Sequence, residues 1–225
     1  MTPKIQVVKA GSNCFLLQAR NGFVLIDSGV ASRRTAVEEK LAHAGCGPGD
    51  LKLIVLTHGD SDHADNCAHL RTVYGAVVGM HPADVQMVEC GDMSLGRKAR
   101  PDRITAMGRV IGLVGRLMSL FGPPPFDRFS PDVLFEDGQS LSSYGLDATI
   151  IHLPGHSKGS IGVLTADGDL FCGDLIYNFF KPNMVWINDM VDGNASISRL
   201  GALNVRAVYP GHGKPFPWAE FAARR

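Results

Sequence analysis

Two histidines and two aspartates fall within the six residues from His58 to His63. Imidazole nitrogens and carboxylate oxygens are the ligands that divalent metal ions take in proteins. An apolar segment that predicts a strand runs directly into His58, so the loop at its end can direct His58 and Asp60 to one point. A helix that begins near Asp62 can direct Asp62 and His63 to a neighbouring point. The spacing therefore predicts a site for two adjacent metal ions.

Three more candidate ligands lie farther along the chain, and each follows an apolar segment that predicts a strand. They are His156, Asp174 and His212. Each has a glycine beside it, which lets the backbone turn sharply or approach a neighbour closely. One histidine after one strand carries little information. Four strand-end loops that all supply ligand-type residues form a specific pattern.

These elements resemble the metallo-β-lactamase superfamily, whose signature is T-H-x-H-x-D-H followed by P-G-H, G-D and G-H. All of them occur in the family's order, and the resemblance spans residues 14–213. It implies an α/β fold, namely an αββα four-layer sandwich of two sheets flanked by helices. It also implies that site 1 is held by His58, residue 60 and His156, that site 2 is held by Asp62, His63 and His212, and that Asp174 bridges the two metals. Asp27 lies in a segment like the family's L-I-D-x-G and is expected to support the ligands.

The chain departs from this signature at Asp60, which stands where the family has its second histidine. Asp60 is either a ligand, since the similar flavodiiron proteins place a carboxylate there, or the cap of the following helix, worth about 1 kcal/mol. As a ligand it adds negative charge, because three carboxylates and one hydroxide would neutralise two divalent ions. Such an oxygen-rich site predicts a shift from zinc, the usual metal of the family, toward iron or manganese.

The resemblance also predicts a mechanism for a dinuclear hydrolase. A metal-bound hydroxide is the expected nucleophile, because a bound metal lowers the pKa of water from about 15.7 to about 7. Asp62 is expected to hold the attacking water or accept its proton. Tyr177 resembles the tyrosine with which the family's lactonases steady the carbonyl or leaving oxygen. The alternative is that Tyr177 is an ordinary core or surface residue.

Strands and helices alternate along the chain, which is typical of a layered α/β domain, and residues 1–225 are predicted to form a single domain. The expected strands are 5–8, 14–18, 23–26, 51–56, 76–80, 149–153, 161–165, 170–172 and 207–209, with a hairpin turn at Asp167-Gly168. The expected helices are about 32–44, 62–73, 104–121 and 217–225.

A helical insert at about residues 82–131 interrupts this alternation. Apolar residues recur at spacings of three and four between Ile104 and Phe121, which predicts a helix with a wide apolar face. That face either packs on its own domain, forms a lid over the active site, or makes a contact in a homodimer.

Composition narrows the range of partners. The chain of 225 residues has a formal net charge of zero, so nothing favours nucleic acid. The apolar region from 104 to 121 contains Arg109 and Arg116, so we expect no membrane span. The N-terminus shows no signal peptide, and the five cysteines are scattered. We therefore expect a cytoplasmic enzyme with reduced thiols and a small-molecule substrate.

The leading functional hypothesis is hydrolysis of an ester-like bond, that is a thioester, a lactone or a β-lactam. A glyoxalase-II-like thioesterase is included, although no room follows residue 213 for the helical domain of that group. The alternative is an iron-dependent oxidoreductase acting on O₂, NO or a persulfide, which Asp60 favours. Iron content and oxygen consumption separate these two. A third hypothesis is a metal-sensing module without catalysis.

Overall fold

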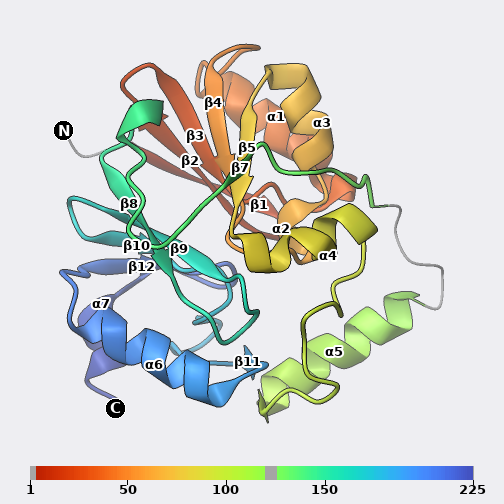
Figure 1. Ribbon diagram of the computed structural model, residues 1–225, viewed down its shortest axis with the longest axis vertical. Coiled ribbons are helices and arrows are strands. Elements are labelled where there is room, and N and C mark those ends of the chain that lie inside the picture. Colours follow the sequence, from red (N-terminus) through yellow and green to blue (C-terminus); the bar gives the residue numbers. More distant parts are fainter. Residues whose placement is uncertain (1–3, 120–125, 225) are drawn as a thin grey trace.

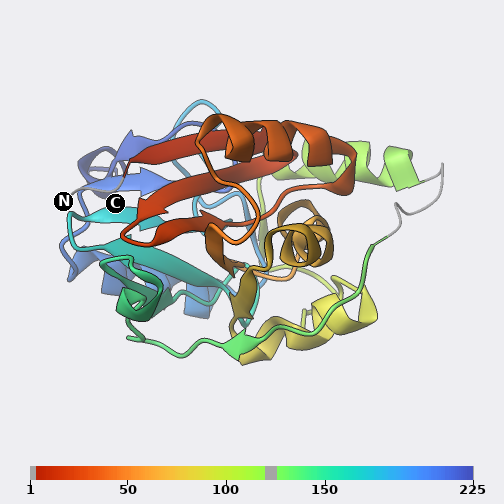
Figure 2. The same ribbon diagram turned by 90° about the horizontal axis from the view of Figure 1, so that it is seen from above.

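The computed structural model describes residues 4–119 and 126–224, except for the side chains at 111, 115, 116, 118 and 119. Two β-sheets face each other in the middle of the molecule, and helices cover their outer faces (Figures 1 and 2). This arrangement is the predicted αββα sandwich, which the structure confirms.

The first sheet has the strand order β1-β2-β3-β4-β5-β7. The strands are β1 (Ile5–Ala10), β2 (Ser12–Ala19), β3 (Gly22–Ile26), β4 (Leu51–Val55), β5 (Val77–Met80) and β7 (Val133–Leu134). The first three strands are antiparallel, whereas β3, β4, β5 and β7 are parallel neighbours. The carboxyl ends of β3, β4 and β5 therefore lie at the same edge of the sheet.

The second sheet has the order β13-β12-β10-β9-β8. Its strands are β8 (Ala148–His152), β9 (Ile161–Thr165), β10 (Asp169–Phe171), β12 (Ala207–Tyr209) and β13 (Phe216–Pro217). The β9–β10 hairpin turns at Gly168, whose φ of +85° suits glycine, as its sequence predicted. β10 and β12 are parallel, so the loops after them also meet at one edge.

Alternation along the strands explains why the sheets stack. In β2, Phe15 and Leu17 point to the core between the sheets, while Cys14 and Leu16 point to the helices outside. The Phe15 ring lies 5.0 Å from the ring of Phe171 in the opposite sheet. These aromatic contacts hold the sheets face to face.

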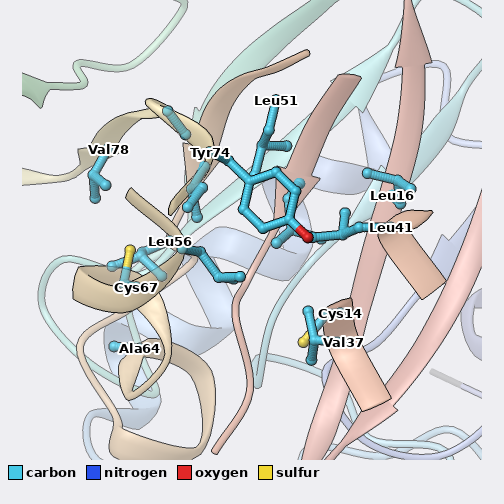
Figure 3. Packing of buried hydrophobic residues seen from close by; sticks show 14 of the residues in the cluster. Cys14, Leu16, Val37, Leu41, Leu51, Leu56, Ala64, Cys67, Tyr74 and Val78 are labelled. Atoms are coloured by element: carbon cyan, nitrogen blue, oxygen red, sulfur yellow. The ribbon is translucent and has the colours of Figure 1, made fainter. Parts of the chain in front are cut away.

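Helices form the two outer layers. α1 (Arg34–His43) and α3 (Cys67–Tyr74) pack on the first sheet, and Figure 3 shows their buried side chains gathered with those of β2 and β4. The second sheet is covered by α6 (Met190–Gly201) and α7 (Trp218–Ala222), which share a core with β8, β10 and β12. The 12-residue helix α6 was not predicted, although Asp189 caps it by accepting from the backbone N–H groups of Val191 and Asp192.

The helix predicted over residues 62–73 is two helices, α2 (Ser61–Ala64) and α3. The break falls where polar side chains bind a neighbouring loop instead of continuing the helix. Asp65 accepts a hydrogen bond from the Ala31 N–H, and the Asn66 amide donates to the carbonyls of Ser28 and Val30. The short helix α2, which carries Asp62 and His63, therefore ends before α3 begins.

The insert at residues 82–131 is helical only in part. Its elements are η2 (Pro82–Asp84), α4 (Val85–Cys90), the short strand β6 (Arg103–Ile104) and α5 (Ala106–Ser119). β6 pairs with β11 (Trp186–Ile187), and the short helices η1 (Ala31–Arg33) and η3 (Ser142–Tyr144) complete the elements of the described chain. Residues 120–125, with the predicted end of the apolar helix, lie outside the described residues.

α5 stands apart from the two sheets (Figure 1). Gly108 and Gly112 approach Val185 and Trp186, so one side of the helix packs on the β6–β11 segment. The other side exposes Val110, Leu113, Val114 and Leu117, each at 50–59%. The apolar face therefore packs on its own domain only in part. Among the described residues, no helix is long and apolar enough to cross a membrane.

Candidate metal centre

The predicted ligands meet at the edge where the strand ends of both sheets come together. The loop after β4 and helix α2 supply His58, Asp60, Asp62 and His63 from the first sheet. The loops after β8, β10 and β12 supply the other three residues from the second sheet, namely His156, Asp174 and His212. The structure brings all seven predicted residues into one cluster, with donor atoms grouped as two sets.

Site 1 gathers His58, Asp60 and His156. The Asp60 Oδ2 atom lies 3.0 Å from Nε2 of His156 and 3.4 Å from Nε2 of His58. Four ligands at about 2.0 Å around a tetrahedral metal lie about 3.3 Å from one another. The spacing of these donor atoms therefore fits a single ion held between them. Asp174 also groups with His58 and His156.

Site 2 gathers Asp62, His63 and His212. Nε2 of His212 lies 3.1 Å from Asp62 Oδ2, and Nε2 of His63 lies 3.7 Å from the same oxygen. Asp174 reaches this set as well, with Oδ1 3.3 Å from His63 Nε2 and Oδ2 3.5 Å from His212 Nε2. Asp174 is therefore placed between the two sets, as a bridging ligand must be.

Three buried atoms of the centre make no hydrogen bond within the described chain: His58 Nε2, His63 Nε2 and Asp174 Oδ1. A buried polar atom without a partner costs about 1–3 kcal/mol. All three atoms belong to residues of the two donor sets, and their histidine and carboxylate chemistry suits zinc, iron or manganese. The residues present therefore fit two divalent ions.

Hydrogen bonds to the other ring nitrogen orient the imidazoles. Nδ1 of His63 lies 2.8 Å from Asp27 Oδ2, and Nδ1 of His156 lies 2.9 Å from the Trp186 carbonyl oxygen. Both contacts place the proton on Nδ1 and leave Nε2 free for a metal. Asp27 also accepts from the N–H and hydroxyl of Thr57, which precedes the first ligand. The backbone of Asp27 has a φ of +58°, which is unusual for a residue other than glycine, and this conformation directs its carboxylate toward His63 and Thr57.

The charges of the centre shift the pKa values of its members. Burial alone lowers the pKa of His63, but the carboxylates of Asp174, Asp27 and Asp62 raise it well above its usual value. Burial also lowers the pKa of His212, but the charge of Asp174 raises it, and the net result is a pKa of about 10. The carboxylates thus attract protons onto the imidazoles when no metal is bound. Metal binding then displaces those protons.

Asp60 does not cap the helix that follows it. It occupies the position before α2, but its side chain makes no capping hydrogen bond. Asp60 Oδ1 instead accepts from Nη2 of Arg97 at 2.6 Å, while Oδ2 faces the two histidines. Burial raises the pKa of Asp60, but Arg97 and His58 lower it well below its usual range, so the carboxylate is ionised. The alternative of a helix cap is therefore wrong.

Tyr177 lies in the centre and not in a remote core. It is buried, and its hydroxyl donates a 2.6 Å hydrogen bond to Asp174 Oδ2. Its ring stacks on that of His212, with centroids 5.4 Å apart and an interplanar angle of 8°. Burial, followed by the charge of Asp174, raises its pKa well above the usual value, so the phenol keeps its proton. The hydroxyl is thereby committed to holding Asp174.

Glycines make the close packing of the ligand loops possible. A Cβ added to Gly211 would overlap Asp174 Oδ1 and lie 2.6 Å from His63 Cε1. Gly173 has a φ of +50°, and a Cβ there would lie 2.6 Å from the Thr57 hydroxyl oxygen. These two glycines let the loops of the second sheet close onto those of the first.

Two residues of the centre were not predicted, Arg97 and Asp84. Asp84 is buried and accepts from the Ser157 hydroxyl at 2.5 Å and the Gly159 N–H at 2.8 Å, with the Gly59 N–H at 3.4 Å. It therefore joins the His58 loop to the His156 loop. Its position just after β5, parallel to β4, was a usable signal. Arg97 lies in a loop between α4 and β6 that carries no motif.

Two cavities open beside the centre. One, of about 450 Å³, extends from His212 to Lys9 and Arg33 and is also lined by Phe179. The other, of about 200 Å³, lies between Tyr177, Phe179 and the start of α5. Its lining is mainly apolar and comprises Thr105, Ala106, Met107, Tyr177, Phe179, Phe180, Lys181, Asn183 and Val185. Because Phe179 lines both cavities, they adjoin.

An αββα sandwich with histidines and aspartates gathered at one edge of its sheets is the arrangement that the resemblance to the metallo-β-lactamase superfamily implied. The sequence pattern of the metallo-β-lactamase superfamily matches residues 8–212, so the chain belongs to this superfamily. The predicted resemblance is thereby confirmed.

Several known proteins and solved structures are similar to this chain. The hydroxyacylglutathione hydrolase GloC of Haemophilus influenzae is 28% identical over 77% of this chain and 70% of its own length. The acyl-coenzyme A thioesterase MBLAC2 of Gallus gallus is 28% identical over 89% of this chain and 72% of its own. The probable metallo-hydrolase YflN of Bacillus subtilis is 30% identical over 89% of this chain and 79% of its own length. The crystal structure of the B3 metallo-β-lactamase BLEG-1 is similar in fold, with a TM-score of 0.71, 21% identity and coverage of 98% and 97%.

Proposed function

We propose that the protein is a dinuclear metal-dependent hydrolase that cleaves thioesters whose thiol part carries negative charge. The observation that carries this proposal is a double set of metal-type ligands that opens into a cavity containing two cationic side chains. The reaction class rests on the ligand sets, and the thioester substrate rests on the cavities.

Two bound divalent ions would supply a hydroxide at neutral pH and polarise the substrate carbonyl. His58, Asp60 and His156 would hold one ion, Asp62, His63 and His212 would hold the other, and Asp174 would bridge them. The remaining roles belong to residues around them. The half-exposed carboxylate of Asp62 can accept the proton of the attacking water. Tyr177 keeps Asp174 in place through its hydrogen bond.

The larger cavity suits an anionic group. Lys9 and Arg33 line it together with His212, and no carboxylate is among its lining residues in the described chain. The Lys9 ammonium donates to Asn13 and to the Gly213 carbonyl oxygen, which holds it beside the loop that carries His212. Two cations on a surface without a lining carboxylate attract phosphate or carboxylate groups. The thiol part of the substrate would lie here.

The smaller cavity suits an acyl chain. It is lined by the Phe179 and Phe180 rings and by Met107 and Val185, and it ends at Tyr177 in the metal centre. A substrate with its carbonyl at the metals can therefore place its apolar acyl part here and its anionic thiol part in the larger cavity. Glutathione and coenzyme A both carry negative charges, and thioesters of these two thiols are what the names of two relatives specify.

The test is a hydrolysis screen of the metal-loaded protein. One acyl group is offered on coenzyme A, on glutathione and on the neutral thiol N-acetylcysteamine, beside a lactone and a phosphoester. We expect the two anionic thioesters to give the highest kcat/KM, and His58→Ala to remove the activity. Equal activity in His58→Ala would contradict a metal mechanism, and a preference for the lactone, the phosphoester or the neutral thioester would contradict the substrate class.

Arg33→Ala gives a finer test. It should raise KM for the coenzyme A thioester about tenfold, which corresponds to about 1.4 kcal/mol, and leave KM for the neutral thioester unchanged. Lys40→Ala, an exposed cation outside the cavity, is the matched control and should change neither value. Equal changes for both thioesters would show that Arg33 does not bind the anionic group.

The carboxylate at position 60 supports a second candidate, an iron-dependent oxidoreductase acting on O₂, NO or a persulfide. Carboxylate-rich sites favour harder ions such as iron or manganese. Iron in the isolated protein together with oxygen consumption would support it. Zinc in the isolated protein with thioester hydrolysis would exclude it.

A further inference from the structure

The least expected member of the metal centre is Arg97, a cation beside atoms that should bind another cation. Its side chain is only 17% exposed, and Nη2 lies 2.6 Å from Asp60 Oδ1 and 3.3 Å from His156 Nε2. Its Nε is buried and makes no hydrogen bond in the described structure. Burying a guanidinium is costly unless a carboxylate compensates its charge. Asp60 is that carboxylate.

The two oxygens of Asp60 have different partners. Oδ1 is taken by Arg97, whereas Oδ2 faces the Nε2 atoms of His58 and His156 at 3.4 and 3.0 Å. A hydrogen bond that holds one carboxylate oxygen fixes which oxygen can ligate and in which direction. The Asp60 carboxylate is therefore prepared to bind a site 1 ion through Oδ2 alone.

The loop that carries Arg97 is itself anchored. The Lys98 backbone N–H donates to the buried side chain of Asn188 at 3.0 Å, and the Lys98 ammonium pairs with Asp102 and Asp189 at 2.8 and 2.9 Å. Asp189 also caps α6. The loop that carries Arg97 is thus held in place by contacts with residues just before α6, the helix that covers the second sheet.

The guanidinium of Arg97 changes the net charge of the metal centre. Asp60, Asp62 and Asp174 bring three negative charges to the centre, and Arg97 returns one positive charge. The sum equals that of a centre with a neutral histidine at position 60. Arg97 therefore removes the excess negative charge from which the shift toward iron or manganese was predicted.

We propose that Arg97 is a positioning residue of the metal centre, and that the Asp60–Arg97 pair replaces the neutral histidine ligand of site 1. The guanidinium holds Asp60 as a one-oxygen ligand and cancels its charge. This inference rests on the proposed metal centre. Zinc therefore remains the expected ion.

A thermodynamic cycle on zinc binding tests the proposal. The metal-free protein is titrated with zinc against a chromophoric chelator, and both stoichiometry and affinity are measured for the wild type, R97M, D60H and the double variant D60H/R97M. We expect two ions in the wild type and a 10–100-fold weaker site 1 in R97M, the range typical for a lost partner of a ligand. In the D60H background the loss of Arg97 should cost nothing or improve binding, because a histidine needs no counter-charge.

Three outcomes overturn the proposal. Unchanged zinc affinity in R97M would show that Arg97 does not position Asp60. A rise from one ion in the wild type to two in R97M would show that the guanidinium occupies the place of the metal. An equal loss on removing Arg97 in both backgrounds would show a merely structural role. R97K, which keeps the charge, should recover part of the affinity and covers the case that R97M does not fold.

The proposed function fails differently. A wild type that binds no zinc at either site would refute the metal centre as a whole. Two bound zinc ions with the same zinc affinity in the wild type and the three variants of the cycle would refute only the role of Arg97.

Discussion

The two ligand sets of the centre are supported in different ways. Site 2 rests on Asp27, a buried residue just after β3 that contacts His63 directly and reaches the site 1 loop only through Thr57. Site 1 is supported by Arg97 and Asp84, which come from segments between β5 and β6 that no family motif describes. One half of the centre is thus held by the core of the fold, while the other half depends on an insert. Substitutions should therefore separate the two sites.

The largest effect is expected for His63→Ala, which removes a ligand of site 2. Metal content should fall by about one ion per chain, and thioester hydrolysis should fall by at least about 10³-fold, because the remaining ion would have to supply hydroxide and polarise the carbonyl without the second ion. Elemental analysis and steady-state kinetics measure the two effects. His43→Ala, at an exposed position on α1, is the control. Full activity with one ion would show that site 2 is dispensable.

Asp27→Ala tests the support of site 2. The His63 ring and the Thr57 N–H lose their acceptor, so zinc affinity should fall about 10–100-fold and the free energy of unfolding by about 2–3 kcal/mol. Chelator competition and urea unfolding of the metal-free protein measure these values. Asp27→Asn keeps an acceptor oxygen and tolerates the positive φ, so it should lose less. A loss confined to site 1 would contradict the assignment.

Asp84→Ala tests the support of site 1. Removing this carboxylate leaves the buried Gly159 N–H without its acceptor and the Ser157 hydroxyl with Ser160 alone, which should lower the free energy of unfolding by about 2 kcal/mol. The affinity of site 1 should fall, while that of site 2 should change little. Asp147→Ala, at an exposed position before β8, serves as control. Equal weakening of both sites would mean that the two supports are not independent.

The smallest effect is expected for Tyr177→Phe, because it removes one hydrogen bond to a residue shared by both sites. We expect a tenfold or smaller decrease in kcat, equal to at most about 1.4 kcal/mol, with two ions still bound. Steady-state kinetics and metal analysis decide this. A decrease of about 10³-fold at full metal content would instead assign Tyr177 a direct contact with the reacting oxygen.

The positions of the candidate ligands were easier to predict from the sequence than the residues around them. His58, His156, Asp174 and His212 were singled out because each follows an apolar segment that predicts a strand and has a glycine beside it. The break between α2 and α3 was missed, since it depends on Asn66 binding carbonyls of a loop far away in the chain.

Arg97 could not be predicted for the same physical reason. Its role depends on where the loop 92–102 lies, and that position is set by contacts of Lys98 with residues 188 and 189. The metal was therefore predicted from the charges of the carboxylates without the positive charge of Arg97, which pairs with Asp60. Asp84, in contrast, follows β5 and could have been found with the strand-end argument already applied to His58.

The origin of the ligands from both sheets has a consequence for folding. His63 and His212 are joined by most of the chain, and bringing them together costs loop-closure entropy that grows slowly with the length of the loop. An ion shared between the two sheets acts as a reversible cross-link, and at a thousandfold excess over its Kd it would stabilise the folded chain by about 4 kcal/mol. The supply of metal in the cell would then govern how long each molecule survives unfolding and proteolysis, in addition to how fast it works.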